Sequence, residues 1–167
     1  MEPTRFQIQT IPCALWGTDS DRVLVVVHGA QSHKEDTPVH LLAETFKNSQ
    51  ILSFDLPEHG ERKDTHTLCK PPACVRDLSA VMDYAEDRWK HIGLFAVSIG
   101  AYFSLLAFEN RRVEQAWFLS PVVDMGVLIH SMMTWFDVTQ ERLEREQSIP
   151  TPMGQTLYWD YFCYVRE

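Results

Sequence analysis

The sequence predicts an α/β fold of three layers, in which a mostly parallel sheet carries helices on both faces. Apolar runs alternate with segments of helical periodicity from residue 22 to residue 121, and this alternation is typical of parallel sheets with right-handed crossovers. The run 23–27 is apolar throughout, as expected of a strand that is buried on both faces. A further apolar run stops at Ser98, where a helical pattern begins. We therefore expect an α/β core over residues 1–121, followed by a helical segment over residues 122–167.

The first elements are expected to be two short strands, a turn and a central strand. Alternation over residues 6–10 and the apolar segment 13–16, separated by Pro12, predict an edge hairpin. Residues 17–21 have the composition of a turn. The β-branched run 22–27 is then expected to be the central strand.

Helices and strands are expected to alternate in the middle of the chain. Thr37 is expected to cap a helix that has Pro38 at its first position. The apolar face of this helix is expected to contain Leu41, Leu42, Thr45 and Phe46. Strands are expected at 50–54, 92–97 and 113–119, with helices at 73–88 and directly after Ser98.

Ser98 is thus placed at a turn from a strand into a helix. Such a turn holds a serine side chain out on a strained backbone, and the first amides of the helix point toward whatever the hydroxyl attacks. Gly100 lets the helix pass close to a neighbouring strand. The string 96–100, AVSIG, is therefore the nucleophile-elbow pattern GxSxG with Ala96 in its first place.

Two more motifs follow strand ends in the same order as in a known family. His28 and Gly29 follow the central strand, and the string DLPEHG at 55–60 follows the strand 50–54. On these motifs the chain resembles an α/β-hydrolase of the serine esterase and lipase type. The resemblance implies that Ser98 is the nucleophile of a carboxylic ester hydrolase.

The resemblance also assigns roles to residues around Ser98. It implies that the backbone amides of Ala30 and Ile99 form the oxyanion hole, with His28, Gly29 and Gly100 as structural neighbours. Asp55 and His59 are interpreted as braces of the active-site loop. Their spacing could also suit a metal ion, but the pattern supplies no third ligand. We expect neither a metal nor a cofactor.

The rest of the triad is harder to place. In the family an Asp or Glu and then a His follow the serine, whereas the residues after Ser98 contain one histidine, His130. The last two strand–helix units of the family also have no counterpart in the pattern. We therefore expect the N-terminal part of a hydrolase, truncated before its last two strands and without a complete triad. A competing hypothesis uses Asp124 as a relocated acid and His130 as the base.

The segment 122–167 is interpreted as a helical lid, which the family inserts at this place. Apolar residues recur at helical spacing from Met125 to Phe136, and aromatic residues crowd 157–165. A surface of this kind suits an apolar acyl group of a small-molecule ester. The other interpretation is that these side chains pack on the sheet.

Composition limits the partners and the compartment. The net charge of -8 argues against nucleic acid and anionic membrane surfaces. The sequence contains neither a secretory signal nor an apolar run long enough to span a membrane, so we expect a cytoplasmic protein. The four cysteines form no CxxC pair and have no histidine at zinc-ligand spacing, so they indicate neither a redox centre nor a structural metal site and are expected to be reduced thiols. The strand 113–119 is expected to be an exposed edge that pairs with a second copy as a homodimer.

Two functions therefore remain open from the sequence. The first is a serine hydrolase acting on carboxylic esters, or the N-terminal catalytic portion of one. The second is a noncatalytic α/β-hydrolase module that binds a small apolar ligand or a partner. The identity of the ester, and the choice of ester over amide or thioester, do not follow from any residue of the chain.

Overall fold

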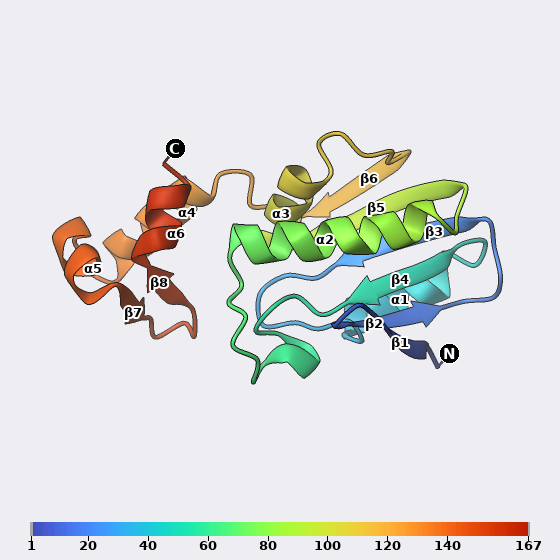
Figure 1. Cartoon of the computed structure of the whole chain (residues 1–167), viewed down its shortest axis with the longest axis horizontal. Helices are drawn as coiled ribbons and strands as arrows, with labels where there is room; N and C mark the ends of the chain where they lie inside the picture. The colour runs from blue at the N-terminus through green and yellow to red at the C-terminus, as the bar shows by residue number, and fades with distance from the viewer. Residues whose placement is uncertain (1, 167) are drawn as a thin grey trace. The chain divides into compact units, whose positions relative to one another are not determined.

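The computed structural model describes residues 2–166, which fold as two compact units, Met1–Pro121 and Val122–Glu167. The first unit is built on a six-stranded sheet with the order β1-β2-β4-β3-β5-β6 (Figure 1). Strands β4, β3, β5 and β6 are parallel, and β2 is antiparallel to both β1 and β4. The strands are β1 (Thr4–Ile8), β2 (Ile11–Trp16), β3 (Arg22–Val27), β4 (Gln50–Phe54), β5 (His91–Val97) and β6 (Gln115–Leu119).

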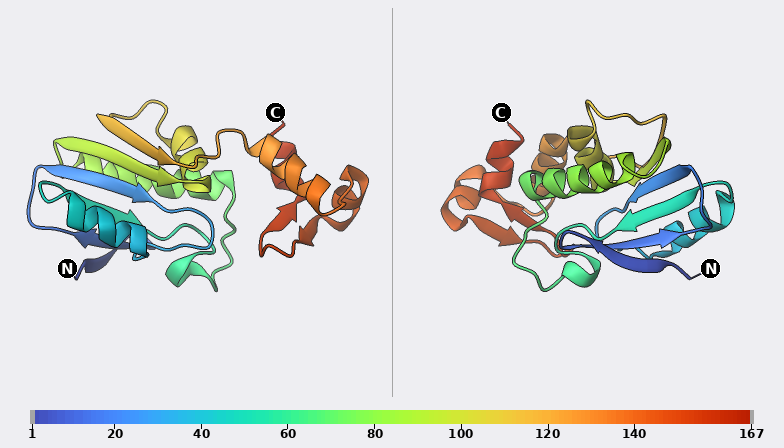
Figure 2. Two further views of the ribbon diagram at one scale, coloured as in Figure 1. Left: turned by 180° about the vertical axis from the view of Figure 1, so that it is seen from behind. Right: turned by 45° about the vertical axis from the view of Figure 1, so that its right-hand side comes forward.

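Helices cover both faces of this sheet. Helices α2 and α3 lie on one face and α1 lies on the other, as the two opposite views show (Figures 1 and 2). The helical elements of the unit are α1 (Thr37–Thr45), the 3-10 turn η1 (Gly60–Arg62), α2 (Pro71–Glu86) and α3 (Ile99–Ala107). The predicted three-layer α/β architecture with a mostly parallel sheet is confirmed.

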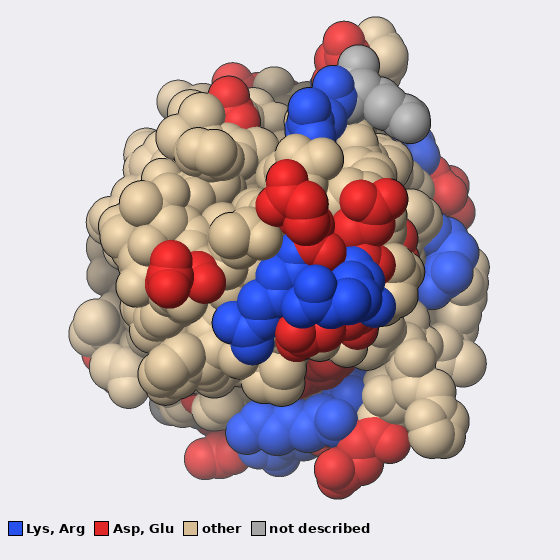
Figure 3. All heavy atoms as spheres, turned by 90° about the vertical axis from the view of Figure 1, so that its left-hand side faces the viewer, with Lys and Arg blue, Asp and Glu red and all other residues tan. Residues whose placement is uncertain are grey.

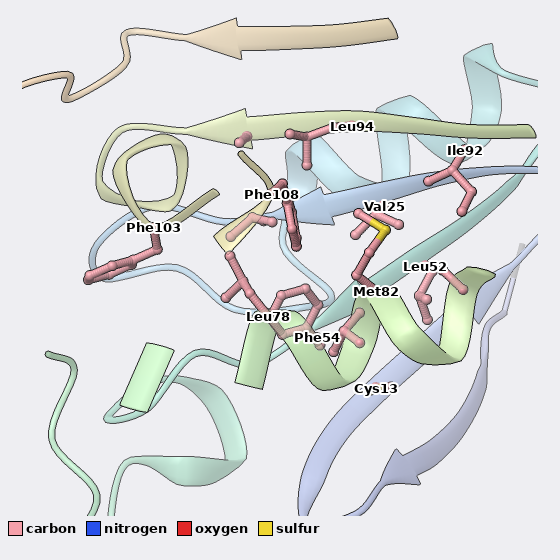
Figure 4. Packing of buried hydrophobic residues seen from close by; sticks show 14 of the residues in the cluster. Cys13, Val25, Leu52, Phe54, Leu78, Met82, Ile92, Leu94, Phe103 and Phe108 are labelled. Carbon is pink, nitrogen blue, oxygen red and sulfur yellow. The ribbon is translucent and has the colours of Figure 1, made fainter. Parts of the chain in front are cut away.

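Strand β3 explains why the core has two halves. Val23, Val25 and Val27 belong to the apolar cluster under α2 and α3, whereas Leu24 and Val26 belong to the cluster under α1. Successive side chains of a strand point to opposite faces, so a continuous apolar run is what a strand between two helical layers requires. Figure 4 shows the larger cluster, in which strand residues such as Val25 and Leu94 face Leu78 and Met82 of α2.

The N-terminal hairpin differs in detail from the prediction. Pro12 lies within β2 rather than before it, and β2 is an interior strand because it pairs with β4 as well as β1. Proline removes one N–H from the ladder but keeps its carbonyl, and the Pro12 carbonyl accepts a hydrogen bond from the Asp55 amide at 3.0 Å. The edge strand of this side is β1.

Helix α1 begins one residue earlier than the prediction placed it. Its cap is Asp36, whose carboxylate accepts a hydrogen bond from the Thr37 amide at 2.8 Å. The buried residues of α1 are Val39 and Ala43, whereas Leu41 is 57% exposed. The predicted cap at Thr37 and the predicted burial of Leu41 are therefore wrong, because the helix turns a different stripe toward the sheet.

Strand β6 is the other edge of the sheet. It begins at Gln115, two residues later than predicted, and all five of its residues are exposed. Its pairing within residues 2–166 is with β5 alone. Trp117, Phe118 and Leu119 are 39%, 39% and 51% exposed, so this edge presents apolar side chains and free backbone groups together.

The second unit is not purely helical. Its elements are α4 (Met125–Trp135), α5 (Gln140–Glu146), β7 (Ser148–Pro150), β8 (Thr156–Tyr158) and α6 (Trp159–Tyr164). Strands β7 and β8 form an antiparallel hairpin that the sequence pattern did not predict within this helical segment. Strands of three residues are too short to give a periodic sequence signal.

The surface of the second unit carries charges of both signs. The face in Figure 3 has basic side chains lying beside acidic ones. On α5, the Arg142 guanidinium donates to the Glu146 carboxylate at 3.0 Å, which is a solvated i,i+4 pair. Within residues 2–166, none of the helices combines the length and apolar character needed to cross a membrane.

Candidate active site

Ser98 lies between β5 and α3, at the strand-to-helix turn that the sequence predicts. Its backbone has φ 52° and ψ −116°, a conformation that costs a non-glycine residue on the order of 1–3 kcal/mol. The Ser98 amide donates to the Leu119 carbonyl at 3.1 Å, which ties the turn to the end of β6. The side chain is partly exposed, and no hydrogen bond among residues 2–166 uses its hydroxyl.

Two glycines bring the backbone close to this serine. A Cβ atom on Gly100 would lie 2.4 Å from the His28 carbonyl oxygen and 2.7 Å from that of Val27. The start of α3 therefore packs directly on the end of β3, as the sequence predicts for Gly100. A Cβ atom on Gly29 would lie 3.3 Å from the Ser98 Cβ. The loop after β3 thus lies against the serine.

Two backbone amides are available next to Ser98. Ala30 follows Gly29 in the loop that lies against the serine, and Ile99 is the first residue of α3. Among the hydrogen bonds of residues 2–166, we find none donated by the amide of Ala30 or Ile99. Ile99 begins α3, and the first N–H groups of a helix have no partner within the helix.

His28 joins the loop after β3 to the loop after β4. Its Nε2 accepts a hydrogen bond from the Leu56 amide at 3.1 Å, so its Nδ1, 2.7 Å from the Gly29 carbonyl oxygen, carries the proton. Burial lowers the pKa of His28 to about 4. The ring is therefore neutral, and both of its nitrogens are used by the backbone, which makes His28 a structural residue.

Asp55 braces the same two loops through a buried ion pair. The side chain is fully buried and accepts hydrogen bonds from the Lys34 amide at 2.8 Å, the Lys34 ammonium at 3.0 Å and the Glu61 amide at 3.0 Å. Lys34 is itself 5% exposed, and its ammonium also contacts Glu61. Burial acts to lower the pKa of Lys34, but its hydrogen bonds to Glu61 and Asp55 raise it overall. The carboxylate of Asp55 is thereby occupied, as a brace would be.

His59 belongs to a cluster with two cysteines. Its ring lies 5.1 Å from the His28 ring, and its Nδ1 is 2.7 Å from the Pro57 carbonyl oxygen. The Cys69 sulfur lies 3.7 Å from that of Cys74. Burial acts to lower the pKa of His59, but the Cys69 thiol and the Pro57 carbonyl raise it overall. The sequence, which lacks a CxxC pair, gives no sign of this contact between Cys69 and Cys74.

Asp124 and His130 both belong to the second unit. The Asp124 carboxylate caps α4 by accepting a hydrogen bond from the Val127 amide at 2.9 Å. His130 is exposed on α4. It lines a hollow of about 300 Å³, and the other residues that line this hollow are Met133, Thr134, Asp137, Val138, Thr139, Gln140 and Phe162. The roles of Asp124 and His130 as acid and base stay predictions.

Sequence reasoning missed Lys34 and a second buried ion pair. The Arg62 guanidinium lies 2.7 Å from the Asp77 carboxylate, and both side chains are buried. Arg62 also donates to the Asp55 carbonyl at 3.1 Å. The signal that was available is Asp77 on the apolar face of the helix at 71–86, because a buried carboxylate needs a cation.

Several proteins of known structure share the fold of this chain. No protein-family model and no curated protein matches this sequence. Among solved structures, the chain is similar to mouse alpha/beta hydrolase domain-containing protein 10, with a TM-score of 0.74 at 13% identity over 99% of this chain and 70% of that one. It is also similar to Est1E from Butyrivibrio proteoclasticus, solved with ferulic acid bound, with a TM-score of 0.71 at 17% identity.

A third solved structure extends the comparison. The proline iminopeptidase-related protein from Thermus thermophilus has a TM-score of 0.60 at 18% identity, over 98% of this chain and 70% of that one. The alignment with Est1E likewise covers 98% of this chain and 70% of that one. The chain thus spans about 70% of the length of all three structures, and these likenesses confirm the fold that the sequence motifs predict.

Proposed function

We propose, from the α/β-hydrolase fold of this chain, that it is a serine hydrolase acting on carboxylic esters, with Ser98 as the nucleophile. The observation that carries the proposal is the backbone of Ser98, which has φ 52° at the end of a parallel strand and leaves the hydroxyl unbonded. A strained residue of this kind is a reason to look for function at that position. Fold alone would not justify the assignment.

The reaction would run in two steps at this serine. The Ser98 oxygen attacks the acyl carbon of the ester, and the amides of Ala30 and Ile99 stabilise the oxyanion that develops. Each such donor contributes on the order of 10²–10³ in rate, because the negative charge exists only in the transition state. The alcohol leaves, and water then releases the acid from the acyl-enzyme.

The proton of the Ser98 hydroxyl needs a base. His28 is unsuited to this role because the Gly29 carbonyl and the Leu56 amide use both of its nitrogens. We propose that this chain lacks a complete triad; in the competing assignment His130 is the base and Asp124 is the acid, which would have to release the Val127 amide to serve. A serine without a base is a poor nucleophile at neutral pH, so we expect low ester turnover from this polypeptide alone.

The substrate class is proposed from two features. Est1E was solved with ferulic acid bound, which supports a small-molecule ester for this chain. The hollow of the second unit is lined by apolar and polar side chains together, among them Met133, Val138 and Phe162. We propose that the second unit is a lid and that this hollow takes the apolar acyl group.

A fluorophosphonate probe tests the serine directly. Such probes label a nucleophilic serine covalently, so wild-type protein should be labelled and Ser98→Ala should not. Ser120→Ala is the matched control, because Ser120 also follows a strand and has a positive φ of 45° but precedes no helix. Labelling that persists in Ser98→Ala, or that is lost in Ser120→Ala, would contradict the assignment.

The second candidate is a noncatalytic module that binds an apolar ligand or a partner. Its support is that the residues after Ser98 hold a single histidine, and that Asp124, the acid of the competing assignment, already caps a helix. Well-folded wild-type protein that resists the probe would favour this candidate. In that case fluorescence titration with an apolar acid would still report binding.

We also propose that the β6 edge pairs with a second copy of the chain. Gln115–Leu119 contains no charged residue to oppose such pairing, and an apolar edge strand of this kind promotes association. Two identical edges related by a two-fold axis pair antiparallel and close the assembly as a dimer. Light scattering should give a dimer mass for wild-type protein and a monomer mass for Trp117→Lys. A monomeric wild-type protein would contradict this proposal.

A further inference from the structure

Cys69 and Cys74 lie together outside the site of Ser98. Cys69 precedes α2, and Cys74 lies in the first turn of that helix. Their sulfur atoms are 3.7 Å apart, whereas a disulfide bond is about 2.05 Å long. A closing movement of less than 2 Å, which is on the order of a rotamer change in the loop before the helix, would therefore join them.

The surroundings make the two thiols unequal. Cys69 is partly exposed, whereas Cys74 is buried. The Cys69 amide donates to the Glu58 carboxylate at 2.7 Å, which fixes the backbone of Cys69. The hydrogen bond from Cys74 lowers the pKa of the Cys69 thiol to about 6, and His59 adds to this effect against the opposing effect of burial. Burial raises the pKa of Cys74, so Cys69 holds the thiolate and Cys74 holds the proton.

We propose that Cys69 and Cys74 form an oxidation site, in which Cys69 reacts with a hydroperoxide and Cys74 resolves the product as an intramolecular disulfide. The geometry of the pair supports this division of roles, because Cys69 is the partly exposed residue and the sulfur of buried Cys74 is already in contact with the Cys69 sulfur. A thiolate beside an imidazole and a second thiol has the features of a redox-sensitive cysteine. The proposal is independent of any role of Ser98.

The chemistry balances without another reactant. The Cys69 thiolate attacks one oxygen of hydrogen peroxide, the O–O bond breaks, and the departing hydroxide takes a proton to become water. Cys69 is then a sulfenic acid. The Cys74 sulfur attacks the Cys69 sulfur, the S–O bond breaks, and the Cys74 proton leaves with the hydroxide as a second water. The two thiols supply the two electrons that reduce the peroxide.

The test treats the whole chain with hydrogen peroxide, blocks the remaining thiols by alkylation and maps the peptides by mass spectrometry. We expect a Cys69–Cys74 disulfide within one chain, with Cys13 and Cys163 still alkylated. Four alkylated thiols, or a disulfide between two chains, would overturn the proposal. Cys163 is the internal control, because it is partly exposed like Cys69 and its thiol contacts no other cysteine sulfur in residues 2–166.

Two variants separate the roles. In Cys74→Ala the reaction should stop at the sulfenic acid of Cys69, which dimedone traps, and Cys163→Ala should leave the disulfide unchanged. Alkylation of wild-type Cys69 by iodoacetamide should have its midpoint near pH 6. At pH 6 the alkylation of Cys69 should be about tenfold faster than that of an ordinary thiol. The larger thiolate fraction of Cys69 outweighs the lower nucleophilicity of its thiolate. This last measurement keeps the proposal testable if Cys74→Ala does not fold, and a midpoint near the ordinary value of about 8.5 would overturn it.

Discussion

Replacing Gly100 by alanine tests whether close packing of α3 on β3 positions Ser98. The new Cβ would lie 2.4 Å from the His28 carbonyl oxygen, which is roughly 1 Å inside an ordinary carbon–oxygen contact of about 3.3 Å. The contact is with backbone, so no rotamer change relieves it. Alanine also favours a helix over glycine by about 1 kcal/mol. Overpacking costs typically about 1–3 kcal/mol, and more when the clash is with backbone. The free-energy cost of this clash therefore exceeds the gain in helix propensity.

We therefore expect Gly100→Ala to lower the free energy of unfolding by roughly 2 kcal/mol. For a chain of this size that corresponds to a fall in Tm of roughly 4–8 °C. Urea unfolding and thermal melts followed by circular dichroism measure both quantities. Gly93→Ala in β5 is the control, because its Cβ would first meet the flexible end of Leu24 at 3.2 Å. A Gly100→Ala variant as stable as wild type would refute the close-packing argument.

Three further predictions concern stability. Ser98→Gly should be more stable than Ser98→Ala by about 1 kcal/mol in urea unfolding, since glycine adopts φ 52° without strain. Lys34→Met should cost roughly 3–5 kcal/mol by leaving Asp55 buried and unpaired, whereas Arg5→Met, which breaks a surface pair with Glu35, should cost less than about 1 kcal/mol. The folded pKa of His28, about 4, lies below the ordinary 6.5, so the unfolded chain binds more protons between these values. The free energy of unfolding should fall by roughly 3 kcal/mol as the pH drops from 6.5 to 4, and it should stay level above pH 6.5. This pH dependence should be absent in His28→Gln.

The elements that sequence predicts well are those whose signal is local. The apolar run of β3 and the change of pattern at Ser98 each need only a few neighbouring residues to be recognised. The cap of α1 was predicted at Thr37 and lies at Asp36, although aspartate and threonine both suit that position. The choice between them is set by which helix stripe meets the sheet, which adjacent residues do not encode.

The parts that sequence could not supply depend on contacts that only the folded path of the chain creates. Lys34 in a polar loop gives no sign of burial until Asp55, from the end of another strand, is placed beside it. Cys69 and Cys74 lack the CxxC spacing, and only the path of the chain into α2 brings their sulfurs together. Lys34 and Asp55 come from loops that follow separate strands, whereas Cys69 and Cys74 lie at the start of α2.

Ser98 combines a local signal with a cost that the fold alone does not require. A turn from β5 into α3 with φ 52° would form at lower cost with glycine, and Gly29 and Gly100 supply the close backbone approaches on either side. The serine side chain therefore adds nothing to the packing of the turn that a glycine would lack, because its hydroxyl makes no hydrogen bond among residues 2–166. A strained, partly exposed serine whose hydroxyl is unbonded among residues 2–166 supports the proposal that this group carries the chemistry. This is why we place the function at Ser98 rather than in the better-bonded His28, Asp55 and His59.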